Sequence, residues 1–386
     1  MQLWRDITRS WQADETRPGL ARWRQRGAIA ALSGVLALAT GSVRAQQQTL
    51  NVVSWDGAYV KSQMLGFIRP YEAQTGHRVE VIQYTGGIDR IREQVRAWNV
   101  HWDVVDLELF DAIRACNEGL LEHFDAATLP PAPDGTPAEE DFIHLGETPC
   151  GVGNVVGSTV VSYRSDRFEQ APVRLEDFFD LERYPGRRGL RRSPMGNLEW
   201  ALIADGVPPD QVYRALSTEQ GLDRAFTVLD GLKPHVAWWQ SGHEAVRMLE
   251  TDQVAMSAVY SGRVAAAVDR GQPLVILWDH QVWYYDVWGI PRHGRNTELA
   301  RDFVRFATST KSLAAQARHI PYGPLRRSSM AELEEDLRRQ LPTSETHLES
   351  ALALDAHWWS EHLDRIGPRF ERWLRQPVMV PRAMPR

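Results

Sequence analysis

Lysine is scarce in this chain. Only Lys61, Lys233 and Lys311 occur among 44 basic residues, so few positions are available for a Schiff base or for the lysine of a phosphate-binding loop. The motifs GxxxxGK and GxSxG are both missing. The stretch His243–Arg247 begins like the zinc-protease motif HExxH but ends in arginine, which removes the second imidazole ligand. The glycine-rich stretch Gly151–Gly157 is one residue too long for a dinucleotide loop. The sequence therefore predicts no cofactor, no metal site and no catalytic residue.

Positive charge is in deficit as well. The chain has 44 basic and 50 acidic residues and a net charge of −6, which argues against a protein whose main task is to hold nucleic acid. Hydrophobic residues make up 43% and charged residues 24%, a balance that favours packed cores over disorder. With 386 residues the chain is long enough for two domains of about 100–200 residues each and a cleft between them.

Long apolar runs are missing apart from one near the N-terminus. Ala28–Ala39 is apolar, follows Arg22, Arg24 and Arg26, and precedes small residues that end at Ala45. A bilayer span needs about 20 apolar residues, so this run is too short to be one and is typical of a secretion signal. We expect residues 1–45 to be a leader that is cleaved after Ala45. The remaining chain has 37 basic and 47 acidic residues, a net charge of −10.

Cysteine occurs only twice, at Cys116 and Cys150, and without the CxxC spacing of many metal sites. In an exported protein such a pair is more often a disulfide than a set of metal ligands. We predict a Cys116–Cys150 disulfide that closes a loop of roughly 35 residues.

The region after the leader has the pattern of a parallel α/β unit. Thr49–Ser54, Arg78–Gln83 and Trp102–Leu107 have the composition of buried strands, and helical spacing begins at Lys61 and after Gly87. In such βαβαβ units, ligands bind beyond the carboxyl ends of the strands. The residues there that combine aromatic and acidic side chains are Trp55, Asp56 and Tyr59 after the first strand, and Glu108 and Phe110 after the third.

The rest of the chain alternates between predicted strands and helices. After Cys150 an extended apolar stretch up to Tyr163 indicates a crossing into a second lobe. The later predicted strands are Arg187–Arg192, Val254–Tyr260, Leu274–Trp278 and Trp283–Ile290. The later predicted helices are Leu175–Phe179, Leu198–Ala204, Pro209–Leu216, Gly221–Leu232, Glu298–Ala307, Ser312–Arg318 and Met330–Gln340.

Several phrases, in their order and spacing, resemble the extracytoplasmic solute-binding proteins of ABC importers, in the spermidine/putrescine-binding group. They are VVSWDGAY (Val52–Tyr59), RPYEAQTGHRVEV (Arg69–Val81), WDVVDLELF (Trp102–Phe110), AVYSG (Ala258–Gly262), VWYYDVWGIP (Val282–Pro291), RDFVRFATS (Arg301–Ser309) and IPYGP (Ile320–Pro324). The resemblance extends over essentially the whole chain after the leader.

The resemblance implies a two-lobed α/β fold, the type II periplasmic-binding-protein fold, whose doubly wound lobes are joined by two crossovers with a ligand cleft between them. The lobes would comprise residues 46–152 for the first part of lobe 1, 153–286 for lobe 2, and 287–386 for the return to lobe 1. It implies a monomeric periplasmic protein that captures a polyamine or similar organic cation and delivers it to a permease in the inner membrane.

The resemblance also extends the set of candidate ligand-binding residues. Polyamine-binding relatives surround the methylene chain with aromatic rings and meet the ammonium groups with carboxylates, in keeping with cation–π attraction and with the need of a desolvated charge for a partner. On this chain the family positions are Trp55, Asp56, Tyr59, Glu108, Phe110, Tyr260, Tyr284, Asp286 and Tyr322, with Glu199 in the second lobe. The second-lobe region Met195–Glu199 departs from the family's acidic pair, which leaves a smaller or singly charged amine open as an alternative ligand.

Two other functions stay open at this point. The same fold could bind a phosphonate or carboxylate through four arginines of the predicted strand Arg187–Arg192, which are Arg187, Arg188, Arg191 and Arg192. A secreted hydrolase that uses cleft carboxylates is the second alternative.

Overall fold

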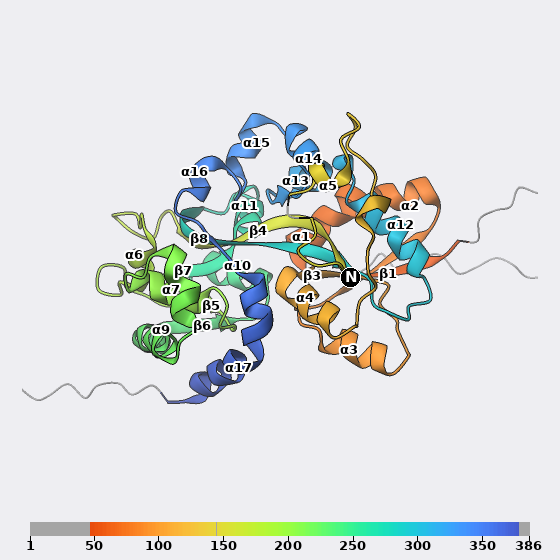
Figure 1. The fold of residues 1–386 in the computed structure, drawn as a ribbon. Coiled ribbons are helices and arrows are strands. Elements are labelled where there is room, and N and C mark those ends of the chain that lie inside the picture. The colour runs from red at the N-terminus through yellow and green to blue at the C-terminus, as the bar shows by residue number, and fades with distance from the viewer. Residues whose placement is uncertain (1–46, 144, 378–386) are drawn as a thin grey trace, which may run out of the picture. The chain divides into compact units, whose positions relative to one another are not determined.

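The computed structural model describes residues 47–143 and 145–377 of the chain. The predicted leader and its cleavage site lie outside these residues. Gln47–Arg386 forms one compact unit, built around a mixed sheet whose strands follow the order β2-β1-β3-β8-β4-β7-β5-β6, with helices on both faces (Figure 1). The predicted α/β fold is confirmed.

One end of the sheet is parallel. β1 (Thr49–Ser54) pairs with β2 (Arg78–Gln83) on one side and with β3 (Val104–Glu108) on the other. These three strands confirm the predicted βαβαβ unit. The helices between the strands are α1 (Gly57–Gln63), the π-helix η1 (Met64–Ile68), α2 (Arg69–Thr75) and α3 (Asp89–Arg96). α4 (Leu109–Asn117) follows β3 directly and was not predicted.

Two long antiparallel strands form the centre of the sheet. β4 (Gly151–Arg164) pairs with β8 (Leu274–Gly289) along most of its length. The sequence predicts two separate strands in place of β8, because the polar residues around His280 interrupt the apolar pattern. In the structure these polar residues belong to one continuous strand, β8, which is irregular at this point. His280 has a left-handed backbone (φ 50°), and the pairing register with β4 shifts there. The predicted lobe boundaries at residues 152 and 286 fall inside these strands and stay predictions.

The other end of the sheet contains β7 (Met256–Tyr260), β5 (Arg188–Arg191) and β6 (Val236–Trp239), with β5 parallel to both neighbours. Its helices are α6 (Leu175–Phe179), α7 (Asn197–Ala204), η3 (Pro209–Gln211), α8 (Val212–Leu216), α9 (Glu219–Leu232), η4 (Lys233–His235), α10 (Gly242–Glu250) and α11 (Ser261–Val268).

The chain returns to the first end of the sheet through α12 (Thr297–Ala307) and α13 (Thr310–His319). α13 packs against η1 so closely that a Cβ at Gly66 would lie 2.8 Å from the backbone nitrogen of Gln316. The single helix predicted over Met330–Gln340 is wrong, because the structure has two short helices, α14 (Arg327–Ala331) and α15 (Glu335–Gln340). The remaining short elements are η2 (Ala126–Thr128), α5 (Ala138–Asp141), β9 (Gly323–Pro324), α16 (Glu345–Leu348) and β10 (Leu352–Ala353).

The last helix, α17 (Ala356–Arg375), packs against both ends of the sheet region. Its Trp373 ring contacts Phe226 of α9 and Trp238 of β6, while Arg114 of α4 forms an ion pair with Asp364 at 2.5 Å. Within the described residues no helix has the length and apolarity that a membrane crossing needs.

The predicted disulfide is confirmed. Cys116, near the end of α4, is bonded to Cys150, which directly precedes β4. The bridge therefore ties a helix at the first end of the sheet to the start of a central strand, across a sequence separation of 34 residues.

We expect a double variant, Cys116→Ala with Cys150→Ala, to have a free energy of unfolding about 2–4 kcal/mol lower than the wild type, because the open chain gains conformational entropy when unfolded. Urea denaturation followed by circular dichroism measures the difference. Equal midpoints for the two proteins would show that the bridge contributes nothing to stability.

Candidate functional site

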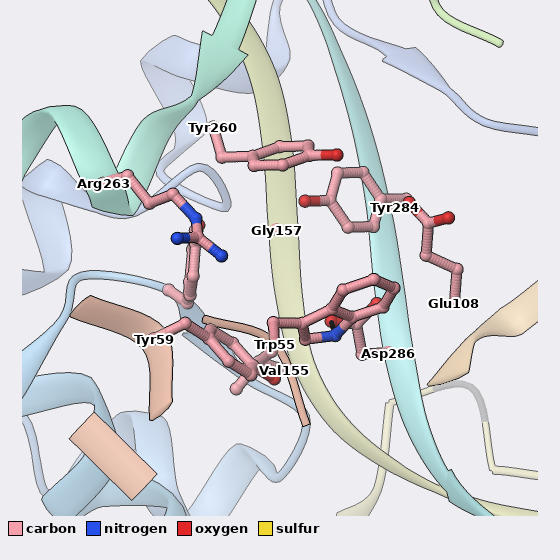
Figure 2. A pocket seen from close by; sticks show the side chains of 10 residues that line it. Trp55, Tyr59, Glu108, Val155, Gly157, Tyr260, Arg263, Tyr284 and Asp286 are labelled. Atoms are coloured by element: carbon pink, nitrogen blue, oxygen red, sulfur yellow. Dashed lines mark hydrogen bonds between the residues drawn. The ribbon is translucent and has the colours of Figure 1, made fainter. Parts of the chain in front are cut away.

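A pocket of about 330 Å³ lies beside the central strands β4 and β8 and is lined by residues from both ends of the sheet. Figure 2 shows its side chains converging from the ends of β1, β3 and β7, from β4 and β8, and from α11. The lining residues are Trp55, Tyr59, Glu108, Val155, Gly157, Tyr260, Arg263, Tyr284, Asp286 and Tyr322. Seven of these were predicted as ligand contacts from the sequence.

Aromatic rings form much of the wall. Tyr59 and Tyr322 have ring centroids 5.7 Å apart, and Tyr260 and Tyr284 have centroids 5.9 Å apart in an edge-on arrangement. Trp55 packs against Tyr84, which follows β2, with centroids 4.9 Å apart. Burial raises the pKa of Tyr59 and of Tyr284 well above the ordinary value, so both phenols stay protonated. The wall therefore presents apolar faces and neutral hydroxyl groups.

Two strands supply carboxylates to one side of the pocket. In the antiparallel register of β3 and β8, Glu108 is directly opposite Asp286, so both side chains project from the same face of the sheet. Glu108 accepts two hydrogen bonds from the guanidinium of Arg191 in β5, at 2.8 and 3.3 Å. Asp286 accepts a hydrogen bond from the Trp55 indole at 3.1 Å through Oδ2, while its buried Oδ1 has no hydrogen-bond partner among residues 47–143 and 145–377.

Asp106 lies on β3 behind these acids and is completely buried. Its Oδ2 accepts hydrogen bonds from the Tyr59 hydroxyl at 2.9 Å and the Gln63 amide at 2.6 Å, together with longer bonds from Ser54 and Asn154. Burial raises the pKa of Asp106 to about 7, against the lowering effect of these neutral donors. Burial and then the charges of Asp106 and Glu108 raise the pKa of Asp286 well above its ordinary value.

Arg263 of α11 brings a positive charge to the opposite side of the pocket (Figure 2). Its Nη1 donates to the Asp56 carboxylate at 2.7 Å and to the Asp56 carbonyl at 2.9 Å, and its guanidinium lies 5.8 Å from the centre of the Tyr260 ring. The Arg263 side chain fits at this position because Gly57 and Gly242 have no Cβ. A Cβ at Gly242 would lie 2.4 Å from the Arg263 Nε. Sequence reasoning missed Arg263, although it directly follows the AVYSG phrase.

Each of the two ion pairs joins residues from opposite ends of the sheet. Asp56 follows β1 and meets Arg263 of α11, while Glu108 ends β3 and meets Arg191 of β5. Arg263 also lines a larger outer groove of about 1,430 Å³, and Glu108 and Arg191 line another of about 1,040 Å³. The two pairs therefore stand between the pocket and the outer grooves.

Three of the predicted ligand contacts do not line the pocket. Asp56 faces Arg263 and reaches the pocket only through that partner. Phe110 lies in the first turn of α4, buried in the core and at the edge of the second outer groove. Glu199 of α7 is fully buried and accepts hydrogen bonds from the Trp359 indole at 2.6 Å, the Tyr213 hydroxyl and the Gly196 backbone. The sequence could not separate Asp56 and Glu199 from ligand contacts because both are acids near aromatic residues, as Asp286 is.

The four arginines of the anion alternative are held by the protein itself. Arg188 donates to four backbone carbonyls, and Arg187 donates to a fifth at Val236. Arg191 is paired with Glu108, and Arg192 is paired with Glu371. Of these four, only Arg191 lies next to the pocket, where its charge is already balanced.

One group of side chains in the described residues has the spacing of metal ligands. It consists of Cys116, His123 and Cys150, whose ligand atoms lie within 4.8 Å of one another. The two sulfur atoms are bonded to each other in the disulfide, so this group offers only an imidazole.

Residues 66–339 match the family model of bacterial extracellular solute-binding proteins. This chain belongs to that family. A γ-aminobutyric acid (GABA)-binding protein of Pseudomonas aeruginosa is 36% identical over 332 residues, which cover 86% of this chain and 92% of the relative.

Solved structures of binding proteins have the same fold. A GABA receptor superimposes with a TM-score of 0.74 at 27% identity, covering 86% of this chain and 99% of its own. A binding protein of Agrobacterium tumefaciens R10 in complex with agropinic acid superimposes with a TM-score of 0.77 at 24% identity, covering 85% and 99%. The predicted periplasmic-binding-protein fold is thereby confirmed.

The narrower assignment to the spermidine/putrescine group has weaker support. A spermidine/putrescine-binding protein of Streptococcus pneumoniae is 15% identical, with a TM-score of 0.64 over 85% of this chain and its whole own length. At this identity the likeness shows the fold alone. The expectation therefore holds for the family of solute-binding proteins of ABC importers, whose members bind small solutes for delivery to a permease.

We expect Glu199→Gln to change the pH dependence of stability. Burial raises the pKa of Glu199 to about 7 in the folded protein, so its neutral form supports folding at low pH and this support is lost as the pH rises through about 7. The unfolding free energy of the wild type should fall relative to the variant between about pH 5 and pH 8. Urea denaturation of both proteins at several pH values measures this. A constant difference across that range would contradict the assignment.

Proposed function

We propose that this protein is the substrate-binding component of an ABC importer for a short linear zwitterion, an ω-amino acid such as GABA. The observation that supports this most strongly is the placement of opposite charges in one small pocket. The Arg263 guanidinium lies at one side and the carboxylates of Asp286 and Glu108 lie at the other, with aromatic rings between them (Figure 2).

The carboxylate of such a solute would meet Arg263. Arg263 is 7% exposed and lines the pocket, and its Nη1 is held by Asp56. A guanidinium held in this way is suited to a carboxylate because its planar donors match the two oxygens. The fixed geometry also lowers the entropy that must be lost on binding.

The ammonium end of the solute would meet Asp286. Within the described part of the chain its buried Oδ1 has no hydrogen-bond partner, and a buried carboxylate oxygen of this kind gains a charge-assisted bond when an ammonium binds. The faces of Trp55 and Tyr284 lie beside it and attract a cation further. The small volume of the pocket favours a chain of only a few carbons between the two charged groups.

The polyamine expected from the sequence fits these charges less well. A diamine would bring a second ammonium next to the Arg263 guanidinium, and like charges in a buried site repel. The named relatives agree with the zwitterion, since a protein with 36% identity is a GABA-binding protein.

Membership of the solute-binding family supports a role in delivering the bound solute to a transporter. We propose that the protein acts as a monomer in the periplasm, presents the solute to a permease of the inner membrane, and releases it unchanged. A solute recovered intact from the complex would also separate this function from the secreted hydrolase.

We expect calorimetry to show binding of GABA and no binding of putrescine by the wild type. Arg263→Gln should weaken GABA binding about 10–150-fold, the equivalent of a lost charge-assisted hydrogen bond of about 1.5–3 kcal/mol. The matched control is Arg270→Gln, which lies on the surface after α11 and pairs with Glu250. The control should bind as the wild type does.

Two outcomes would overturn this proposal. Binding of putrescine without GABA would restore the polyamine prediction. An equal loss for the Arg263 and Arg270 variants would show that the guanidinium does not meet the solute.

We expect Gly157→Ala to weaken GABA binding about tenfold or more, because a Cβ at this position would lie 2.8 Å from the hydroxyl and ring of Tyr284 and would push that ring into the pocket. The control is Gly231→Ala in α9, where a Cβ meets no atom within 4 Å. Thermal unfolding checks that both variants fold. Unchanged GABA affinity in the Gly157 variant would place the solute away from Tyr284.

A further inference from the structure

Three carboxylates share one face of two neighbouring strands. Glu108 is opposite Asp286 in the antiparallel register, and Asp106 lies two residues before Glu108 on β3. Residues two apart on a strand project from the same face, so Asp106 is a diagonal neighbour of Asp286, at a typical Cα separation of about 7–8 Å. All three side chains are buried, with exposures of 0% for Asp106, 5% for Glu108 and 4% for Asp286.

Only one of these three acids has a cation. Arg191 pairs with Glu108, whereas every described hydrogen-bond donor to Asp106 or Asp286 is neutral. These donors are the indole of Trp55, the hydroxyls of Tyr59 and Ser54, and the amides of Gln63 and Asn154. In addition, Oδ1 of Asp106 and Oδ1 of Asp286 are both buried without a hydrogen-bond partner among the described residues. If Asp106 and Asp286 were both ionised, two buried negative charges would lie close together without a bonded cation, which is energetically unfavourable.

The other charged and titratable groups around this pair compensate its charge only in part. The charge of Arg191 lowers the pKa of Asp286, but this guanidinium is paired with Glu108. Tyr59 on α1, Tyr84 after β2 and Tyr322 before β9 stay neutral phenols because burial raises the pKa of each. Asp111 on α4 adds a further acid on the side of Glu108, and its nearest cation is Arg114. The Arg263 guanidinium of α11 is paired with Asp56.

We propose that the empty protein holds one proton on the Asp106–Asp286 pair, and that capture of an ammonium-bearing solute releases this proton. The ammonium replaces the proton as the positive charge beside Asp286. Asp106 is then a positioning residue that acts through Asp286 and does not touch the solute. This inference rests on the proposed function, since it needs a solute with an ammonium group.

The direction of both pKa shifts agrees with this reading. Burial raises the pKa of Asp106 to about 7 and raises that of Asp286 well above the ordinary value. The pair therefore carries a proton near neutral pH in the empty state. Because one proton leaves for each solute bound, the affinity should rise about tenfold per pH unit below the pKa of the pair and level off above it.

The test is calorimetry of GABA binding at about pH 6.5 in two buffers with very different ionisation enthalpies, cacodylate and ACES, repeated over a pH series. The wild type should release about one proton per GABA bound. Asp106→Asn should still bind GABA, because the amide keeps an acceptor for Tyr59 and Gln63. It should release clearly less than the one proton of the wild type and have a weaker pH dependence of affinity, because the Asp106 charge that helps to raise the pKa of Asp286 is gone.

The matched control is Asp111→Asn. Asp111 is also buried with a pKa raised to about 7, but it lies on α4 and does not line the pocket. This control should keep the proton release of the wild type.

The outcomes separate the two proposals. GABA binding with equal heats in both buffers would overturn the proton release and leave the proposed function standing. No heat with GABA in either buffer would overturn the proposed function and the coupling together. If Asp106→Asn does not fold, the wild-type buffer comparison and its pH series still decide the question.

Discussion

The antiparallel pairing of β4 with β8 is the constraint on which the rest of the molecule depends. Both strands run through the centre of the sheet and carry neighbours at both ends, β3 and β10 on β8, β7 and β9 on β4. Because of this pairing, pocket residues as far apart in sequence as Trp55 and Tyr322 lie close together in the fold. A strand irregularity at His280 lets β8 keep this course through polar residues.

This arrangement concentrates charge in a place that water does not reach easily. Buried charges are tolerated only with partners, and the structure meets this requirement in two ways. Glu108 and Arg263 are balanced by side chains from the opposite end of the sheet, so the same ion pairs that neutralise them also hold the two ends together. The hydrogen-bond donors to Asp106 and Asp286 in the described part of the chain are all neutral, and this is the basis of the proton release proposed above.

The family and the pocket carry different kinds of information. The family match and the superimposed structures concern the fold and the general task of binding solutes, which relatives with quite different named ligands share. Specificity depends on which charges face a small cavity. In the function proposed above, Arg263 among the aromatic rings is the charge that favours a zwitterion over a diamine.

The sequence by itself determined the α/β fold, most helices and strands, and three pocket residues (Trp55, Tyr59 and Glu108), because hydrophobic periodicity and the rule that ligands bind at strand ends are local properties of the chain. The disulfide followed from the presence of only two cysteines, and four more pocket residues (Tyr260, Tyr284, Asp286 and Tyr322) followed from the family resemblance. Only the tertiary structure decided the partners of the charges. Asp56, Glu199 and Asp286 are all acids near aromatic residues in sequence, yet one meets an arginine, one meets an indole and a phenol deep in the core, and one faces the pocket. Ion pairs join residues up to 250 positions apart, as between Arg114 and Asp364, and no local sequence pattern specifies such a distant partner.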